Sequence, residues 1–247
     1  MTGTDILAPG ELPHRVMLST MTYRPHDLLW IAEAHALAFT GDRPGWASPD
    51  WLRAAPVVVR RAPREPGRLP VGLRGRARHE RCAAHVAEGQ VLCVATPEAV
   101  LDDWRRGGRG AEVCRRRGLP CLDALAALAR AWSALPLVWG VTGGVGFSLA
   151  SGLDTLRPDS DLDLLVRAPV AADAVVLSRL GADLAAKPVR VDVQVETPRG
   201  AFALAEWLRT GGTVLLRTDA GPAIVDDPWV GPAAVSSSYA VTCAMGR

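Results

Sequence analysis

Apolar and polar positions alternate in short blocks through the second half of the chain. Short apolar runs typical of strands are separated by segments of helical periodicity, and Gly or Pro stands at most junctions. In chain order the pattern predicts a helix at Leu122–Leu135, a strand at Leu137–Val141, a short helix at Phe147–Ser151, a strand at Asp161–Arg167, a helix at Ala171–Leu180, a strand at Val189–Val195, a helix capped by Thr197 and Pro198 that runs through Leu208, and a strand at Thr213–Arg217. This order predicts an α/β or α+β fold in which helices flank a mixed sheet.

The first half of the chain predicts a smaller α+β domain. Its longest periodic segment, His26–Phe39, has the spacing of a helix and is followed by Gly41 and Pro44, which end helices. The other expected elements are a helical turn at Asp50–Arg53, strands at Pro56–Arg60, Val71–Arg74 and Val91–Ala95, an exposed loop at Arg61–Pro70, and a helix opened by Thr96 and Pro97. We expect a basic N-terminal domain over residues 1–88, a second domain over residues 89–247, and a frayed tail at Val235–Cys243.

The composition is that of an ordinary soluble globule, with 247 residues, 49% hydrophobic content, 22% charged content and a net charge of +2. No apolar run is long enough to span a bilayer, and Met1–Arg15 lacks the apolar core of a signal peptide. The five cysteines are odd in number and never spaced as Cys-x-x-Cys, which disfavours a disulfide framework or a zinc site. We therefore expect a cytoplasmic protein without membrane association.

Paired carboxylates stand at the start of one predicted strand. Asp161 and Asp163 project from the same face, about 6–7 Å apart, while Leu162 and Leu164 take the buried face. Asp192 lies in the next predicted strand and projects away from its flanking valines. Such carboxylates can share one or two Mg²⁺ ions about 3.5–4 Å apart, as in phosphoryl and nucleotidyl transfer. An Asp-x-Asp sequence also caps turns, an alternative that the third acid disfavours.

A glycine turn precedes these acids in the same supersecondary unit. Gly143 and Gly144 follow a predicted strand, and Ser148 comes shortly after them. We expect the backbone amides of this turn and the Ser148 hydroxyl to meet phosphate oxygens at a helix N-terminus. The run lacks the Gly-x-Gly-x-x-Gly spacing of a dinucleotide site, and the absence of His from the second half disfavours Ser148 as a nucleophile.

The strongest charge cluster spans Arg60–Arg81, where eight Arg accompany two Glu. It is either a solvated basic loop or a surface for phosphates or for an acidic protein partner. The segment contains no Phe, Tyr or Trp, so stacking on the bases of a nucleic acid is unsupported. We expect no nucleic-acid partner.

Taken together, these residues resemble the nucleotidyltransferase superfamily associated with DNA polymerase β. The glycine turn, the paired acids and the distant Asp192 follow its pattern, although the gap from the glycines to Asp161 is longer than usual. Within that superfamily the chain resembles, over roughly residues 12–230, the phosphoribosyl-dephospho-CoA transferases, or holo-acyl-carrier-protein synthases, of malonate decarboxylase. The segments that carry this resemblance are Pro25–Trp30, Leu69–Gly75 with Arg78 and Arg81, Trp139–Leu149, Asp159–Leu164 and Val191–Leu208. Gly144 stands where that branch more often has Ser.

The resemblance implies a Mg²⁺-dependent enzyme with a nucleotidyltransferase-like C-terminal domain. Such an enzyme transfers phosphoribosyl-dephospho-CoA from 2′-(5″-triphosphoribosyl)-3′-dephospho-CoA to a serine of the acyl carrier protein subunit of malonate decarboxylase, and pyrophosphate leaves. The implied roles are metal binding or proton acceptance for Asp161, Asp163 and Asp192, pyrophosphate contacts for Gly143, Gly144 and Ser148, and a phosphate clamp from Arg74, Arg76 or Arg78. The alternatives are an NTP-dependent nucleotidyltransferase acting on another hydroxyl and a non-catalytic module that binds a carrier protein.

Overall fold

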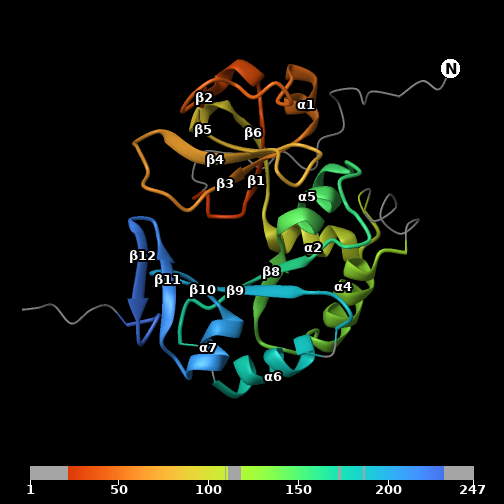
Figure 1. Cartoon of the computed structure of the whole chain (residues 1–247), viewed down its shortest axis with the longest axis vertical. Helices are drawn as coiled ribbons and strands as arrows, with labels where there is room; N and C mark the ends of the chain where they lie inside the picture. The colour runs from red at the N-terminus through yellow and green to blue at the C-terminus, as the bar shows by residue number, and fades with distance from the viewer. Residues whose placement is uncertain (1–21, 109, 111–117, 172–173, 186, 231–247) are drawn as a thin grey trace, which may run out of the picture.

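The structure, a computed structural model, describes residues 22–108, 110, 118–171, 174–185 and 187–230. Over these residues the chain forms two six-stranded sheets, one from each half, with helices α2 (Pro97–Arg105) and α5 (Gly143–Ser151) at the level between them (Figure 1). This confirms a mixed α and β fold. Among the described residues, no helix is both long and apolar enough to cross a bilayer.

The N-terminal sheet is antiparallel and has the strand order β2-β5-β4-β3-β1-β6. Its strands are β1 (Leu28–Ile31), β2 (Leu37–Phe39), β3 (Val57–Val59), β4 (Arg68–Arg74), β5 (Arg81–Ala87) and β6 (Val91–Ala95), with short 3-10 turns at Ala34–Ala36 and Glu88–Gln90 and helix α1 at Pro49–Ala54. The predicted turn at Asp50–Arg53, the strand at Val91–Ala95 and the helix after Thr96 are confirmed. β6 pairs with β1 in this first sheet, although it lies beyond residue 88.

The predicted helix at His26–Phe39 is wrong, because this segment forms β1, a 3-10 turn and β2. All four residues of β1 are buried, and the strand pairs with β3 on one side and β6 on the other. A short apolar run that is buried on both faces cannot be told from a buried helix by its periodicity. The expected loop at Arg61–Pro70 is wrong at its end, since β4 begins at Arg68.

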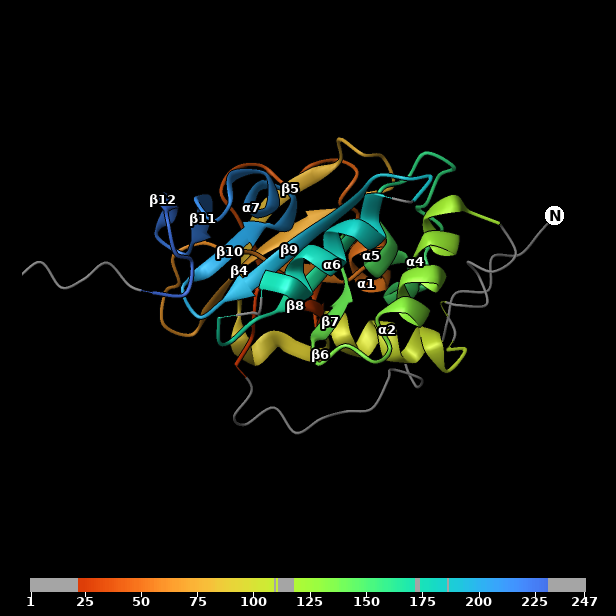
Figure 2. The same ribbon diagram turned by 90° about the horizontal axis from the view of Figure 1, so that it is seen from below.

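The C-terminal sheet is mixed and has the order β12-β11-β10-β9-β8-β7, in which β8 and β9 are parallel and the other pairs are antiparallel. Its strands are β7 (Val138–Val141), β8 (Leu162–Arg167), β9 (Val191–Thr197), β10 (Gly200–Ala203), β11 (Val214–Thr218) and β12 (Gly221–Val225). Its other helices are α4 (Pro120–Ala131), α6 (Ala174–Ala185) and α7 (Leu204–Thr210). α6 and α7 cover the face of this sheet that is turned away from the N-terminal half (Figures 1 and 2).

Two boundaries in this half differ from the predictions. Thr197 does not cap a helix: it ends β9, and its hydroxyl lies 3.2 Å from the carbonyl oxygen of Gly200 and 2.9 Å from that of Pro228. β10 then folds back on β9, and α7 starts only at Leu204. Proline presets the φ angle that the second position of a tight turn requires, so a Thr-Pro pair is compatible with a turn as well as with a helix start. The glycine run, expected as a turn before a helix at Phe147, is itself the first turn of α5.

Side chains from each half enter the core of the other. Phe147 of α5 is 1% exposed and packs in the N-terminal core, whereas Leu28 and Trp30 of β1 pack in the C-terminal core. Arg167 at the end of β8 is 9% exposed and forms ion pairs with Asp27, Glu98 and Glu196. The two halves are therefore joined by apolar packing and by a buried cluster of charges. The expected tail at Val235–Cys243 lies outside the described residues.

Candidate active site

Asp163 and Asp192 are lateral neighbours in the parallel ladder of β8 and β9. Neighbouring strands lie about 4.7–4.9 Å apart, so the two carboxylates leave the sheet side by side. Asp161 comes two residues before Asp163, immediately ahead of β8, and is half-buried. The register therefore brings together the acids that the sequence placed on two separate strands.

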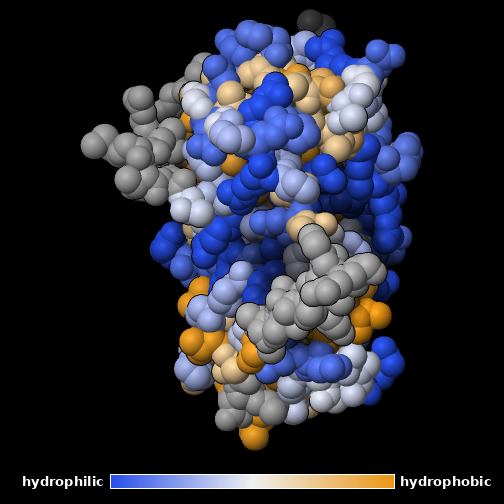
Figure 3. Space-filling view, turned by 90° about the vertical axis from the view of Figure 1, so that its left-hand side faces the viewer, coloured by the Kyte–Doolittle hydropathy of each residue, from blue (hydrophilic) through white to orange (hydrophobic). Residues whose placement is uncertain are grey.

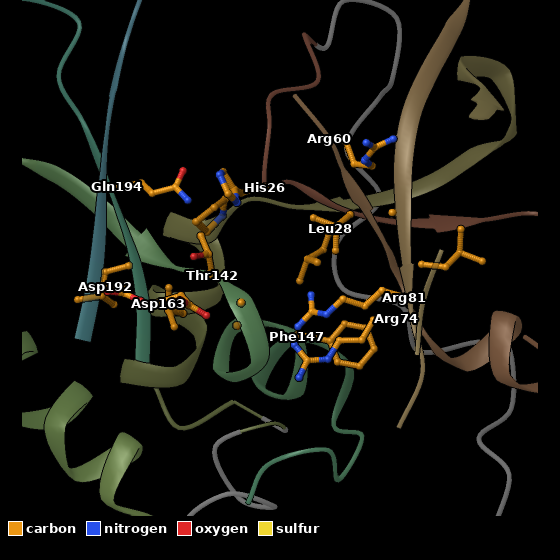
Figure 4. A pocket seen from close by; sticks show the side chains of 18 of the residues that line it. His26, Leu28, Arg60, Arg74, Arg81, Thr142, Phe147, Asp163, Asp192 and Gln194 are labelled. Carbon is orange, nitrogen blue, oxygen red and sulfur yellow. The ribbon is translucent and has the colours of Figure 1, made fainter. Parts of the chain in front are cut away.

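A cavity of about 540 Å³ lies between the two halves, with Asp163 and Asp192 in its lining (Figure 4). The C-terminal half lines it with Gly143, Asp163, Asp192 and Gln194, among others. Hydrophilic side chains also dominate the level between the halves on the face shown in Figure 3. The N-terminal half contributes charged or polar residues that include His26, Arg60, Arg74 and Arg81.

Asp163 and Arg74 perturb one another inside this cavity. Burial raises the pKa of Asp163 above its ordinary value, and repulsion from Asp192 and Asp161 adds to the effect, while Arg74 and Arg81 oppose it. Burial likewise lowers the pKa of Arg74, and the positive charge of Arg81 adds to the effect. Acids that repel one another therefore lie opposite two guanidinium groups that repel one another. A cation bound by the acids together with an anion bound by the guanidinium groups would relieve both repulsions.

Gly143 and Gly144 lack side chains at the places where Asp163 and Arg74 approach the backbone closely. Gly143 has φ +60, and a Cβ at this position would overlap the carboxylate of Asp163. A Cβ on Gly144 would lie 3.0 Å from Nη2 of Arg74. The backbone at the N-terminus of α5 thus sits directly against one acid and one guanidinium, where its free amides and the helix dipole favour an anion.

Aromatic rings hold Arg74 in place. The indole of Trp51 donates a hydrogen bond to the carbonyl oxygen of Arg74 at 2.7 Å, and the Arg74 guanidinium lies 5.7 Å from the ring centre of Phe147. Arg76 is directed elsewhere: its guanidinium stacks on Trp51 at 4.6 Å and does not line the cavity. Arg78 lies outside the lining as well and pairs with Asp161 at 3.3 Å. Of the three arginines expected to grip phosphates, Arg74 is the one that lines the cavity.

Ser148 lies away from the cavity. Its side chain is 2% exposed, and its hydroxyl is hydrogen-bonded to the hydroxyl of Thr155 at 2.7 Å. The α5 helix begins at Gly143, so Ser148 lies in its second turn rather than at its N-terminus. This position gives the serine a structural contact between α5 and the loop that leads to β8.

The acids have the donor chemistry that Mg²⁺ prefers, although their side chains are held by arginines. No group of three His, Cys, Asp or Glu side chains in the described part of the chain is gathered as a metal cluster. Asp161 is drawn to Arg78, and Asp192 is paired with Arg190 at 3.0 Å. Both arginines are at least 70% exposed, and exposed ion pairs contribute roughly 0–1 kcal/mol. Carboxylate oxygens are ligands that suit a divalent cation, but Asp161 and Asp192 would have to turn away from these arginines to share one with Asp163.

Gln194, Arg81 and His26 line the cavity but were not among the site residues predicted from the sequence. Gln194 could have been found, because it shares the strand face of Asp192. Arg81 could have been found by pairing, since it lies opposite Arg74 in the β4–β5 hairpin. His26 carried no such signal, because its segment was interpreted as a helix.

Both halves of the chain match models of one known protein family. The C-terminal domain model of the phosphoribosyl-dephospho-CoA transferase MdcG matches residues 111–228, and the N-terminal domain model matches residues 24–97. No solved structure matches the chain significantly. Curated relatives named phosphoribosyl-dephospho-CoA transferase include those of Pseudomonas syringae pv. tomato (41% identity over 85% of this chain and 95% of the relative), Klebsiella pneumoniae strain 342 (41%, 84% and 97%) and Pseudomonas putida strain GB-1 (42%, 83% and 95%). The chain therefore belongs to the phosphoribosyl-dephospho-CoA transferase family.

Proposed function

We propose that the protein transfers the phosphoribosyl-dephospho-CoA group from 2′-(5″-triphosphoribosyl)-3′-dephospho-CoA to a serine of the acyl carrier protein subunit of malonate decarboxylase, with release of pyrophosphate. The observation that supports this best is the Asp163–Asp192 pair, which faces Arg74 and Arg81 across the cavity in a chain of this family. The cavity thus offers carboxylates for a cation on one wall and guanidinium groups for phosphates on the other.

In this proposal the substrate's triphosphate lies between the two walls. Arg74 and Arg81 hold its oxygens from the N-terminal sheet, and the N-terminus of α5 at Gly143 receives the part that leaves. Asp161, Asp163 and Asp192 would hold Mg²⁺, which when bound neutralises the triphosphate and lowers the pKa of the attacking hydroxyl. Holding both reactants in this cleft lowers the entropic part of the barrier.

The chemical step is one displacement at phosphorus. The serine oxygen forms a bond to the α-phosphorus while the bond from that phosphorus to the pyrophosphate oxygen breaks, so pyrophosphate carries away the electron pair. The serine proton passes to a carboxylate of the Asp163–Asp192 pair.

Intact-mass measurement of the carrier protein tests this proposal. With substrate and Mg²⁺, the wild-type enzyme should add the mass of one phosphoribosyl-dephospho-CoA group, and EDTA should stop the reaction. Asp163→Asn should slow the transfer by about a thousandfold or more, as loss of a central catalytic group does. Asp159→Asn, an exposed acid in the preceding turn, is the matched control and should transfer normally. An unmodified carrier with the wild-type enzyme, or full transfer by Asp163→Asn, contradicts the proposal.

An NTP-dependent nucleotidyltransferase would use the same acids and the same helix N-terminus. Pyrophosphate release from a panel of NTPs separates the two activities, because the proposed enzyme should not turn over ATP. A non-catalytic carrier-binding module would bind the carrier without Mg²⁺-dependent substrate binding, which calorimetric titration measures.

A further inference from the structure

One row of the N-terminal sheet forms an uncharged wall of the cavity. Cross-strand pairing sets Leu28 of β1 opposite Val58 of β3, Val58 opposite Gly72 of β4, and Gly72 opposite Ala83 of β5. All four residues line the cavity. A continuous row of small and apolar residues across four strands makes a flat surface, which suits a planar ring better than it suits phosphate.

The next pair along the same sheet face is charged. Arg74 lies two residues after Gly72 and opposite Arg81, so the cationic part of the wall begins where the apolar row stops. The cavity therefore has a cationic end beside α5 and, beside β1, a second end that we call the uncharged end after its row of sheet residues, although Arg60 also lines it. Figure 4 shows this division on the other side of the cavity as well, where His26 lies beside Gln194 and apart from Arg74 and Arg81.

His26 is held in an unusual backbone conformation at the uncharged end. Among the described residues it is the non-glycine residue with positive φ, at 75°. Its amide donates to the carbonyl oxygen of Val59 at 3.0 Å, and the amide of Val59 donates to the carbonyl oxygen of Asp27 at 2.9 Å, so β3 fixes the turn on both sides. Strained non-glycine residues of this kind concentrate at binding sites.

The imidazole of His26 lies beside the side chain of Gln194 (Figure 4). Burial lowers its pKa to about 4, and the positive charge of Arg61 contributes, so the ring is neutral near pH 7. A neutral imidazole and an amide each offer both a donor and an acceptor, as the edge of a nucleobase requires. Gln194 lies two residues beyond Asp192 on one strand face, about 6–7 Å further along β9.

We propose that this uncharged end binds the adenosine part of the dephospho-CoA substrate, with the base on the Leu28–Val58–Gly72–Ala83 row and its edge hydrogen-bonded by His26 and Gln194. The triphosphate then lies at the Arg74 and Arg81 end, and the reacting phosphorus lies between the two ends at the acids. This inference rests on the proposed function and assigns each end of its substrate to one end of the cavity. Arg60 lies beside Gly72, where its Cδ would be 3.4 Å from an added Cβ, and its guanidinium can stack on the base.

Calorimetric titration of the full chain with two probes tests the assignment. The first probe is 3′-dephospho-CoA, which carries the adenosine part without the triphosphate, and the second is inorganic triphosphate with Mg²⁺. His26→Asn keeps a residue that tolerates positive φ but removes the ring. This variant and Gln194→Ala should each weaken the binding of 3′-dephospho-CoA about tenfold, the loss expected for a buried hydrogen bond, and should leave triphosphate binding within about twofold.

Two further variants sharpen the test. Ala83→Leu fills the flat row and should also weaken 3′-dephospho-CoA selectively, whereas Arg74→Ala should weaken triphosphate selectively. His35→Asn, an exposed histidine outside the cavity, is the control and should bind both probes normally. Unchanged binding of 3′-dephospho-CoA by His26→Asn and Gln194→Ala overturns the assignment, and so does an equal loss for both probes.

The outcome is independent of catalysis, because neither probe requires the carrier protein. A wild-type enzyme that binds both probes but modifies no carrier serine would refute the proposed function and leave the nucleoside subsite standing. A wild-type enzyme that modifies the carrier while His26→Asn binds 3′-dephospho-CoA normally would refute the subsite alone.

Discussion

The carboxylate of Asp163 occupies the space that a Cβ on Gly143 would need. The glycine turn and the acid are therefore a single structural unit, in which the helix N-terminus is brought against the carboxylate by the absence of a side chain. Gly143→Ala should displace Asp163 and reduce transfer to the carrier protein by at least about a hundredfold, because misplacement of a reacting group by about 1 Å costs that much. The initial rate of carrier modification measures this loss.

Gly152→Ala is the matched control for Gly143→Ala. Gly152 also has positive φ, at 71°, but a Cβ there meets no atom within 4 Å. Both variants should lose about 1 kcal/mol of stability from the strained backbone, while only Gly143→Ala should lose activity. Equal rates for the two variants would show that the contact with Asp163 is unimportant.

The contacts of Arg74 and Arg76 predict different effects for the two arginines. Arg74→Ala removes a guanidinium that faces Asp163 in the cavity and should raise the KM for the substrate by about ten- to a hundredfold, the effect of losing a charge-assisted hydrogen bond. Arg76→Ala removes a guanidinium that stacks on Trp51 outside the cavity and should change KM less than about threefold. Steady-state kinetics of the two variants decide between them, and equal increases would contradict the assignment of the phosphate clamp to Arg74.

The acids could be predicted from the sequence because buried apolar residues alternate with them in their strands. Leu162, Leu164 and Val193 are buried, so the parity of the strand assigns Asp163 and Asp192 to the opposite face. Their lateral pairing depends on the register of a parallel ladder, which no local pattern specifies. The sequence therefore predicts the strand face on which each acid lies, whereas the pairing of Asp163 with Asp192 is known only from the structure.

The N-terminal wall could not be predicted in the same way. The row that includes Gly72 and Ala83 is set by hairpin register, and β5 had no clear pattern beside the Arg60–Arg81 cluster. His26 was assigned to a helix, because Leu28 and its apolar neighbours in β1 are buried on both faces and give no alternation. In both places tertiary pairing, not local preference, decides the conformation.

Arg167 should be the most costly charged residue to replace at the contact between the halves. Its guanidinium is paired with Asp27, Glu98 and Glu196, and Arg167→Met would leave these carboxylates buried without their shared cation. We expect a loss of about 3–5 kcal/mol in the free energy of unfolding. Urea denaturation measures it.

The control for this replacement is Arg179→Met, on the exposed face of α6, which should change the free energy of unfolding by less than about 0.5 kcal/mol. Similar curves for both variants would mean that the buried cluster contributes nothing beyond packing.

His26 and Asp27 are adjacent but should give opposite dependences of stability on pH. Burial raises the pKa of Asp27 to about 6 from 3.8, so its contribution is present at low pH and is lost as the pH rises through 6. Burial lowers the pKa of His26 to about 4 from 6.5, so its contribution is present above pH 6.5 and is lost as the pH falls through 4. Between these limits the two effects nearly cancel in the wild-type protein.

Asp27→Asn should therefore lose up to about 1.4 kcal/mol per pH unit on acidification from 6.5 to 4, and His26→Asn should gain stability over the same interval. Urea denaturation at a series of pH values measures both slopes. Parallel profiles for the two variants would show that these groups do not titrate as their burial requires.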